Sequence, residues 1–295
     1  MLTSIEDAGA AFKARFLAVI VSITVLLICV RPANGQAGSP TPDANLANPT
    51  QVVTVKRDGY TVAGLVTHLQ GVKTFKHAVA LFPGHPGIMK LREKEGQARF
   101  ELRGNFLVRS RRHWLDAQTL VVVVDAPSDQ WATFYQTFRE TPRYGADVGA
   151  LLKEVAQRFG VDEWTFVGTS EGSVSALHAA RMNAGLKPRL ILTSSLFQAT
   201  RNGPGLSGVS SDAYPERTLW VHHESDLCTY TQYRDAQRFA DKSRRPLVTV
   251  RGGDPGRGDP CGPFAAHGFV GIEGEAVRAM RSWVNTGVVP SDVSR

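Results

Sequence analysis

The sequence predicts an α/β fold in which one mostly parallel sheet is covered by helices on both faces. Short apolar runs without polar alternation predict strands buried on both sides, and amphipathic stretches between them predict helices. Strands that alternate with helices along a chain are typical of parallel sheets. A chain of 295 residues that is 42% hydrophobic and 21% charged is not intrinsically disordered, and three cysteines are too few for a disulfide-dense scaffold.

The N-terminal segment, residues 1–35, has the pattern of a secretory signal peptide. An uncharged apolar run at residues 16–30 follows two basic residues and precedes small residues. We expect cleavage after Gly35, with Ala37 as the alternative. An uncleaved membrane anchor is the other interpretation, but a helix needs roughly 20 apolar residues to cross a bilayer and this run is shorter.

Removal of residues 1–35 changes what the composition means. The formal net charge falls from +7 to +6, 260 residues remain, and Cys29 is discarded with the signal. We expect the mature protein to be secreted or periplasmic, with membrane contact only through the signal segment before its cleavage.

A net positive charge is also common in proteins that bind nucleic acids. The densest basic cluster is Arg109, Arg111, Arg112 and His113, and its neighbours are apolar, as in a helix that lies on a sheet. No nucleic-acid-binding motif accompanies the cluster. We therefore interpret it as a solvated helix face and expect no nucleic-acid partner.

The predicted elements follow one another along residues 51–295, which we interpret as one domain. A flexible polar leader, residues 36–50, precedes a β-hairpin of residues 52–56 and 60–68 that turns at Asp58-Gly59. The runs that predict buried strands are residues 78–82, 120–124, 164–167, 190–193, 218–222 and 247–250. The stretches that predict helices are residues 147–159, 173–183, 230–239 and 275–284.

Residues 168–172, Gly-Thr-Ser-Glu-Gly, match the pattern G-x-S-x-G between a predicted strand and a predicted helix. A serine on such a turn, here Ser170, takes a strained backbone conformation that exposes its hydroxyl as a nucleophile. Glycine is needed on either side because a Cβ atom would collide with the neighbouring strand and helix. A phosphate-binding turn is the alternative, but the lysine of a P-loop is missing.

With this motif, the order of elements over residues 51–286 resembles the α/β-hydrolase family. The resemblance implies an eight-stranded, mostly parallel sheet with little or no cap domain, and a nucleophile, an acid and a histidine in that chain order. Residues 194–217 are long enough for only a short cap. The aromatic residues within 125–144 either form a wall of the site or pack in the core.

The segment His267-Gly268-Phe269 precedes the last predicted helix and resembles the family's histidine loop, which implies that His267 is the general base. Asp226 follows the strand at residues 218–222, as the acid does in the family, and would orient the imidazole. Three other carboxylates compete for this role: Glu224, Asp254 and Asp259.

Residues 82–87, Phe-Pro-Gly-His-Pro-Gly, end an early predicted strand and resemble the family's oxyanion loop. The resemblance implies that the backbone N–H groups of His85 and Glu171 bind the developing oxyanion. A plain Pro-Gly turn is the alternative, and the side chain of His85 can line the pocket instead.

The remaining candidates are two histidines and two cysteines. His222 and His223 end a predicted strand, but no third metal ligand lies at a plausible spacing, so we expect neither a metal nor an organic cofactor. Cys228 and Cys261 form an even pair in an exported protein, which predicts a disulfide. This disulfide would tie the loop of the acid to the loop of the base.

These features together predict an exported serine hydrolase that acts on a small-molecule carboxylic ester. Ser170, His267 and Asp226 would form the triad, and water would release the acyl group from the enzyme. Two alternatives stay open: a serine peptidase or amidase on the same fold, and a non-catalytic binding protein with this fold.

Overall fold

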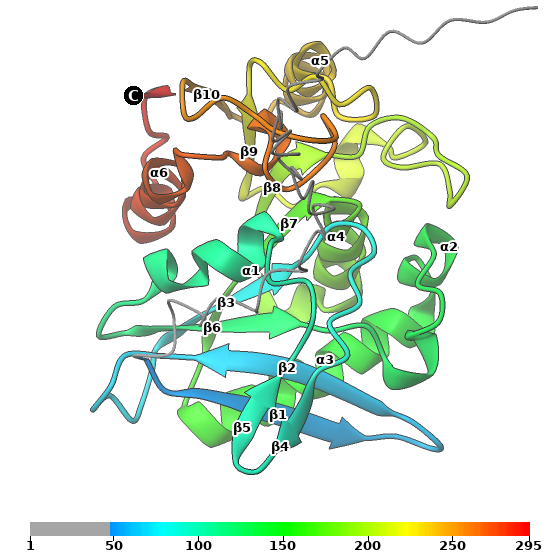
Figure 1. The fold of residues 1–295 in the computed structure, drawn as a ribbon, viewed down its shortest axis with the longest axis vertical. Helices are drawn as coiled ribbons and strands as arrows, with labels where there is room; N and C mark the ends of the chain where they lie inside the picture. Colours follow the sequence, from blue (N-terminus) through cyan, green and yellow to red (C-terminus); the bar gives the residue numbers. More distant parts are fainter. Residues whose placement is uncertain (1–47) are drawn as a thin grey trace, which may run out of the picture. The chain divides into compact units, whose positions relative to one another are not determined.

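A nine-stranded sheet forms the centre of the computed structural model, which describes residues 48–295 (Figure 1). The spatial order of its strands is β1-β2-β6-β3-β7-β8-β9-β10-β11. Their bounds are β1 Thr50–Lys56, β2 Thr61–Thr67, β3 His77–Phe82, β6 Thr119–Val124, β7 Glu163–Ser170, β8 Arg189–Ser195, β9 Thr218–His223, β10 Leu247–Arg251 and β11 Val293–Ser294. The predicted signal peptide and its cleavage site lie outside the described residues.

The predicted direction of the strands is confirmed. The β1–β2 and β2–β6 pairs are antiparallel, and every other neighbouring pair of the large sheet is parallel. The hairpin turns at the predicted place, where Lys56 pairs with Thr61 and Gly59 takes a φ of +78°. The expected number of eight strands is wrong, because the short β11 pairs with β10 and adds a ninth strand at that edge.

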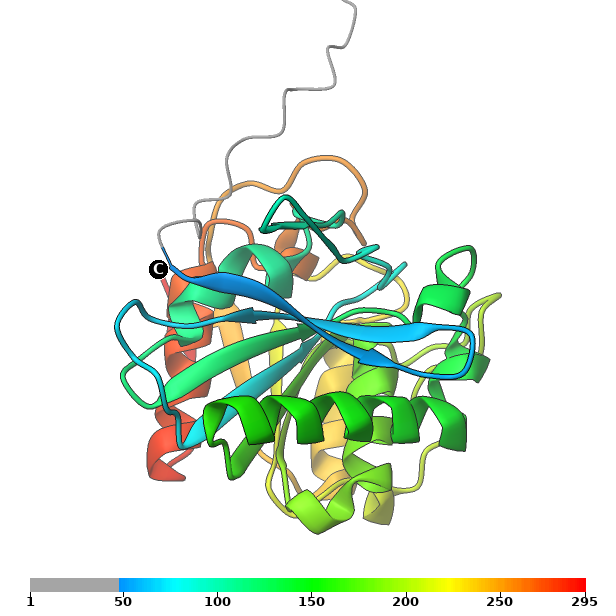
Figure 2. The ribbon, with the colours of Figure 1, turned by 90° about the horizontal axis from the view of Figure 1, so that it is seen from below.

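Helices cover both faces of the sheet, because neighbouring residues of each buried strand point to opposite sides. On one face, α3 (Pro142–Phe159), α4 (Gly172–Met182) and α5 (Tyr233–Ser243) share a core with Ala78 and Ala80 of β3. On the other face, α1 (Phe106–Ser110) and α6 (Glu273–Thr286) share a core with Val79 and Leu81. Figure 2 shows α3 lying along its face of the sheet.

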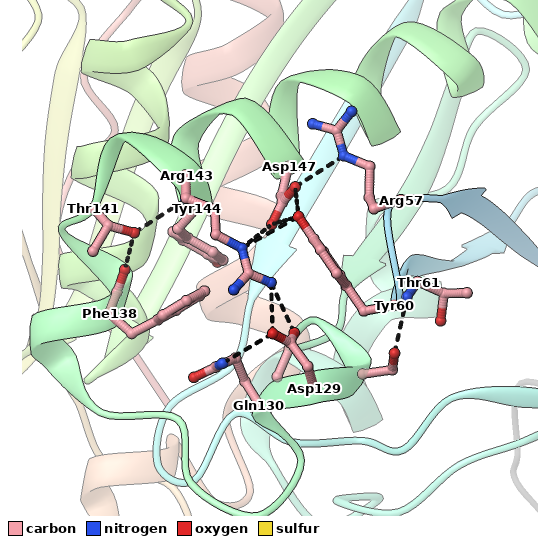
Figure 3. A network of polar contacts seen from close by, with 12 residues as sticks. Arg57, Tyr60, Thr61, Asp129, Gln130, Phe138, Thr141, Arg143, Tyr144 and Asp147 are labelled. Carbon is pink, nitrogen blue, oxygen red and sulfur yellow. Dashed lines mark hydrogen bonds and ion pairs between the residues drawn. The ribbon is translucent and has the colours of Figure 1, made fainter.

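A polar network fixes the antiparallel hairpin to α3 (Figure 3). The carboxylate of Asp147 on α3 accepts hydrogen bonds from Tyr60 Oη and Arg57 Nε, each at 3.0 Å. Arg143, one turn earlier on the same helix, donates to Asp129 at 2.7 Å. Because Asp147 is buried, these bonds offset the cost of removing its charge from water.

Three smaller elements were not predicted from the sequence. A second sheet consists only of the hairpin β4 (Arg92–Lys94) and β5 (Gln97–Arg99). A short helix, α2 (Gln136–Arg139), precedes α3. Within residues 48–295, no helix is both long and apolar enough to span a membrane.

The basic cluster at residues 109–113 is not a solvated helix face, and this expectation is wrong. Helix α1 ends after five residues, and a 3₁₀ turn follows it at Arg111–Trp114. This turn directs Arg111 inward, where its side chain is 1% exposed and donates to the carbonyl of Val108 and to Thr67 Oγ1. Within the cluster, Arg112 is exposed, whereas Arg109 and His113 are partly buried.

Candidate active site

The proposed nucleophile lies on a sharp turn between a strand and a helix. Ser170 is the last residue of β7, and α4 begins two residues later at Gly172. The backbone of Ser170 takes a φ of +54°, in the left-handed region that side chains with a Cβ atom rarely adopt. The structure therefore has the strained turn that the sequence predicts.

The two glycines of the motif are required by close packing. A Cβ atom on Gly172 would overlap the carbonyl oxygen of Phe82 and would lie 2.7 Å from that of Pro83. A Cβ atom on Gly168 would lie 2.8 Å from the Cβ atom of Ala176 on α4. Strand, helix and the loop after β3 can thus approach one another only because both positions lack a side chain.

The predicted acid and base contact each other directly. Nδ1 of His267 lies 3.0 Å from Oδ2 of Asp226, and both side chains are buried. Thr231 donates from Oγ1 to the same carboxylate oxygen at 2.8 Å, and its Oγ1 lies 3.1 Å from His267 Nδ1. The other carboxylate oxygen, Oδ1, accepts the backbone N–H of Cys228 at 2.9 Å. Asp226 therefore has partners for both oxygens.

The competing carboxylates make other contacts. Glu224 pairs with Arg251 at 2.7 Å on the surface. Asp259 accepts the backbone N–H of Cys261, and Asp254 packs on Gly271. Among the described carboxylates, only that of Asp226 is hydrogen-bonded to the imidazole of His267.

The loop that carries His267 is anchored from two other elements. Ser194, which lies within β8, donates from Oγ to the carbonyl of His267 at 2.8 Å. Arg109 on α1 donates from Nη2 to the carbonyl of Gly268 at 2.7 Å and pairs with Glu273 of α6 at 2.8 Å. Arg109 thus holds the histidine loop, a role that the interpretation as a surface charge did not anticipate.

Ser170 and His267 line the same pocket, which has a volume of about 120 Å³. His85 and Cys261 lie on its walls as well. The residues that line the pocket are Gly84, His85, Leu102, Asn105, Phe106, Thr169, Ser170, Cys261, Pro263, His267 and Gly268.

The loop after β3 lies directly against the serine. A Cβ atom on Gly84 would be 2.9 Å from the Cβ atom of Ser170, so only glycine allows this approach. Within residues 48–295, the backbone N–H groups of His85 and Glu171 donate no hydrogen bond. Two free N–H groups beside a nucleophile can bind a negatively charged oxygen.

A buried ion pair between Glu171 and Arg139, which the exposed side chain of His85 also contacts, supports this loop, and the sequence did not point to it. The carboxylate of Glu171 lies 3.2 Å from His85 Nδ1 and 3.2 Å from Arg139 Nη2. Arg139, on α2, also donates to the carbonyl of Pro86 and to Ser175 Oγ on α4, each at 2.9 Å. The guanidinium of Arg139 therefore connects the loop after β3 with α4.

The charges in this network compensate one another. Burial alone would raise the pKa of the Glu171 carboxyl, but the hydrogen bond from His85 and the charge of Arg139 outweigh burial and hold this pKa below its usual value. Burial lowers the pKa of Arg139, and the charge of Glu171 opposes that change. An ion pair forms because each partner offsets the desolvation of the other.

The predicted disulfide between Cys228 and Cys261 is present, with an S–S distance of 2.07 Å. Cys228 also donates its N–H to Asp226, and Cys261 lies on the pocket wall. The bridge therefore joins the loop of the acid to the wall of the pocket.

The two neighbouring histidines on β9 do not converge on a common point. His222 Nε2 accepts the backbone N–H of Ser195 at 3.1 Å, whereas His223 Nε2 donates to the carbonyl of Gly252 at 2.8 Å. Burial lowers the pKa of His222 to about 3, so its ring is neutral at pH 7. Within residues 48–295, no three His, Cys, Asp or Glu side chains are arranged to hold a metal ion.

The expectation of little or no cap domain agrees with the lining of the Ser170 pocket, which includes no residue of 194–217 and no aromatic residue of 125–144. In the loop after β8, Leu206 and Val209 line a second pocket together with residues of α4, and Asn202 donates to Glu171 Oε1 at 3.4 Å. Phe134, Phe138 and Tyr144 pack against one another with ring centroids 5.5–6.1 Å apart, which supports core packing instead of a wall.

Solved structures of hydrolases have a similar fold. An alpha-beta serine hydrolase homologue from Coxiella burnetii has a TM-score of 0.50 at 13% identity, over 81% of this chain and 97% of that chain. A lidless α/β serine hydrolase from Xanthomonas campestris has a TM-score of 0.49 at 15% identity, over 78% and 94%. A cold-adapted esterase from an Arctic intertidal metagenomic library has a TM-score of 0.48 at 13% identity, over 70% and 86%. No family model and no curated protein matches the sequence.

The arrangement of strands and helices agrees with the first of these structures. In this chain, a mostly parallel sheet is covered by helices on both faces. The chain has the α/β-hydrolase fold.

Proposed function

We propose that this protein is an exported serine hydrolase that cleaves carboxylic esters. The observation that carries the proposal is one pocket lined by Ser170, on its strained turn, and by His267, whose Nδ1 lies 3.0 Å from buried Asp226. A serine, an imidazole and a carboxylate in this relation are the groups that acyl transfer needs. The likeness of the fold to a serine hydrolase homologue supports the same chemistry.

The proposed reaction has two halves. Ser170 Oγ attacks the ester carbonyl and passes its proton to His267 Nε2, while Asp226 stabilises the imidazolium through Nδ1. The N–H groups of His85 and Glu171 bind the oxyanion. The alcohol then leaves with the proton from Nε2. A water molecule attacks the acyl-enzyme in the same way, and the acid and free Ser170 are released.

The lining of the pocket supports an ester rather than the amino terminus of a peptide as the substrate. None of the residues that line it carries a carboxylate, so it offers no group of that kind to pair with the amino terminus of a peptide. A peptidase remains the second candidate, because the triad itself cleaves either bond.

Export is part of the proposal and is supported by two features. The apolar run at residues 16–30 has the composition of a signal peptide. The disulfide joins the only two cysteines that cleavage would leave, and disulfides persist in oxidising compartments. N-terminal sequencing of protein from the cell envelope or medium would test cleavage after Gly35, and an intact N-terminus would contradict it.

Turnover of matched substrates tests the chemistry. We expect the purified protein to hydrolyse p-nitrophenyl acetate and to leave the corresponding p-nitroanilide intact. Ser170→Ala should lose at least about a thousandfold in kcat because the nucleophile is gone. Ser207→Ala, which removes an exposed hydroxyl bonded to Pro204, is the control and should keep full activity. Equal turnover by wild type and Ser170→Ala would contradict the proposal.

A further inference from the structure

The two residues whose N–H groups are proposed to bind the oxyanion also contact each other through their side chains. Nδ1 of His85 lies 3.2 Å from Oε2 of Glu171. His85 is on the loop after β3, whereas Glu171 lies between the end of β7 and the start of α4. Each amide nitrogen is bonded to the Cα atom that carries one of these side chains. The contact therefore links the two proposed donors, which come from distant parts of the chain.

The buried side chain of Arg139 binds both sides of this contact. Its Nη2 lies 3.2 Å from the same carboxylate oxygen, Oε2 of Glu171, and donates to the carbonyl of Pro86 at 2.9 Å. Gly87 lies directly on the guanidinium, since a Cβ atom there would be 2.8 Å from Nη2. One cation thus holds the carboxylate of Glu171 and the backbone that follows His85.

The contact with His85 is not needed to keep the carboxylate of Glu171 in the interior. Arg139 already supplies the opposite charge, and Asn202 donates to Oε1 at 3.4 Å. The side chain of His85 is 68% exposed, and an ion pair with an exposed partner contributes little to stability. Its position is on the wall of the pocket that Ser170 lines. Loss of this contact should therefore affect the reaction more than folding.

Stabilisation of an oxyanion requires donors that are in place before the negative charge develops. The N–H of His85 follows Gly84, which lies against Ser170 and has the backbone freedom of a glycine. Within residues 48–295, this N–H donates no hydrogen bond, so no partner of its own fixes its direction. The bond between the imidazole and Glu171 supplies a restraint at this residue.

We propose that the side chains of His85, Glu171 and Arg139 position the two oxyanion donors. The carboxylate of Glu171, held by Arg139, binds the imidazole of His85 and thereby sets the separation and direction of the two N–H groups. This role rests on the proposed function. The three side chains act through the backbone beside them and take no part in the transfer of the proton.

Substitution of the exposed imidazole tests the role. His85→Leu keeps the backbone N–H and should lower kcat on p-nitrophenyl acetate about tenfold with KM unchanged, because loss of a whole oxyanion donor costs about 10²–10³ and a displaced donor costs less. Phenylboronic acid forms a tetrahedral adduct with an active serine, and its inhibition constant should rise by a similar factor. His85→Asn retains an N–H donor near the position of Nδ1 and should recover most of both losses.

Arg238→Leu is the matched control. Arg238 is 64% exposed and pairs with the 4% exposed Asp235 of α5 at 2.8 Å, much as the 68% exposed His85 pairs with the 5% exposed Glu171. Neither Arg238 nor Asp235 lines the pocket of Ser170. This variant should keep the kcat and the inhibition constant of the wild type. Thermal unfolding of each variant shows whether a loss of activity comes with a loss of stability.

The outcomes separate the two proposals. Failure of the wild type to hydrolyse the ester overturns the proposed function and the positioning role with it. In an active wild type, an unchanged kcat of His85→Leu overturns the positioning role alone, and so does a fall in kcat that leaves the inhibition constant unchanged. An equal fall in Arg238→Leu overturns it too. If His85→Leu melts below the wild type, His85→Ala carries the same comparison.

Discussion

At Ser170 the backbone takes a left-handed conformation that costs about 1–3 kcal/mol for a residue other than glycine. Tight packing around Gly168 and Gly172 keeps the residue there. Such a conformation is retained where it positions a group for chemistry. Among the described serines, Ser194 also has a positive φ, of +38°, but its side chain is buried and bonded to the carbonyl of His267, whereas Ser170 lines the pocket.

Thr231 acts on the proposed reaction through Asp226 and is a positioning residue. Its hydroxyl donates to the carboxylate oxygen that faces His267. We expect Thr231→Val to lower kcat about tenfold, because hydrogen bonds to charged groups are among the stronger ones. KM should not change, and Thr231→Ser, which keeps the hydroxyl, should restore kcat. A loss of stability without a change in kcat would contradict this role.

His77 makes the stability of the protein depend on pH. Burial lowers its pKa to about 4, so the folded protein takes up this proton less readily than the unfolded chain, whose histidine has a pKa of 6.5. The contribution of His77 is complete above pH 6.5 and is lost as the pH falls toward 4.

The free energy of unfolding of the wild type, relative to that of His77→Gln, should therefore fall by about 2 kcal/mol between pH 7 and pH 5. Denaturant unfolding of both proteins at each pH measures this difference. A difference that stays constant over this range would show that His77 is protonated equally in the folded and unfolded states.

Between elements, Arg139 connects α2 with α4 and with the loop that carries His85. Its side chain is 1% exposed, and so its removal leaves the buried carboxylate of Glu171 without its charged partner. We expect Arg139→Met to lower the free energy of unfolding by about 3–5 kcal/mol. Arg158→Met, which breaks an exposed pair within α3, should cost no more than about 0.5 kcal/mol. Equal losses in the two variants would contradict the role of the network.

The order of these elements was largely predictable from the sequence. The six buried strands and four of the helices lie where apolar runs and helical spacing predicted them, because burial of a strand on both faces leaves a continuous apolar segment. The hairpin β4–β5 was missed because its strands are short and mostly exposed. Strand β11 was missed because a strand of two residues is too short to show an apolar run or an alternation of apolar and polar residues.

The parts of the site that the sequence did not predict depend on contacts between distant segments. Arg139 and Arg109 look like ordinary surface charges in the sequence, and only the fold brings Arg139 to Glu171 and Arg109 to Gly268. The residues that the motifs singled out did come together, since Ser170 ends β7, Asp226 follows β9, and the loop after β10 carries His267 back to them. Their catalytic roles stay predictions.

On the scale of the whole molecule, the site forms where the carboxyl ends of neighbouring parallel strands meet. Ser170 ends β7, Asp226 follows β9, and the loop with His267 follows β10. Open parallel sheets bind ligands at this edge because the loops that leave it converge there. The disulfide links two of these loops across the sheet.

The disulfide closes a segment of 33 residues and should stabilise the whole domain. Loop-closure entropy predicts about 3–4 kcal/mol for a span of this length. We expect reduction, or the double substitution Cys228→Ser with Cys261→Ser, to lower the melting temperature and to reduce ester hydrolysis, since the bridge joins Asp226 to the pocket. Titration should find no free thiol in the unreduced mature protein, and two free thiols with unchanged melting would contradict the bridge.

Labelling with a fluorophosphonate tests the proposed chemistry most directly, because this reagent reacts with an activated serine and needs no knowledge of the natural substrate. Peptide mass spectrometry of the labelled protein should place one phosphonate on Ser170, with no label on Ser170→Ala and strongly reduced label on His267→Ala. An unlabelled wild type, or a phosphonate that persists in Ser170→Ala, would contradict Ser170 as the nucleophile.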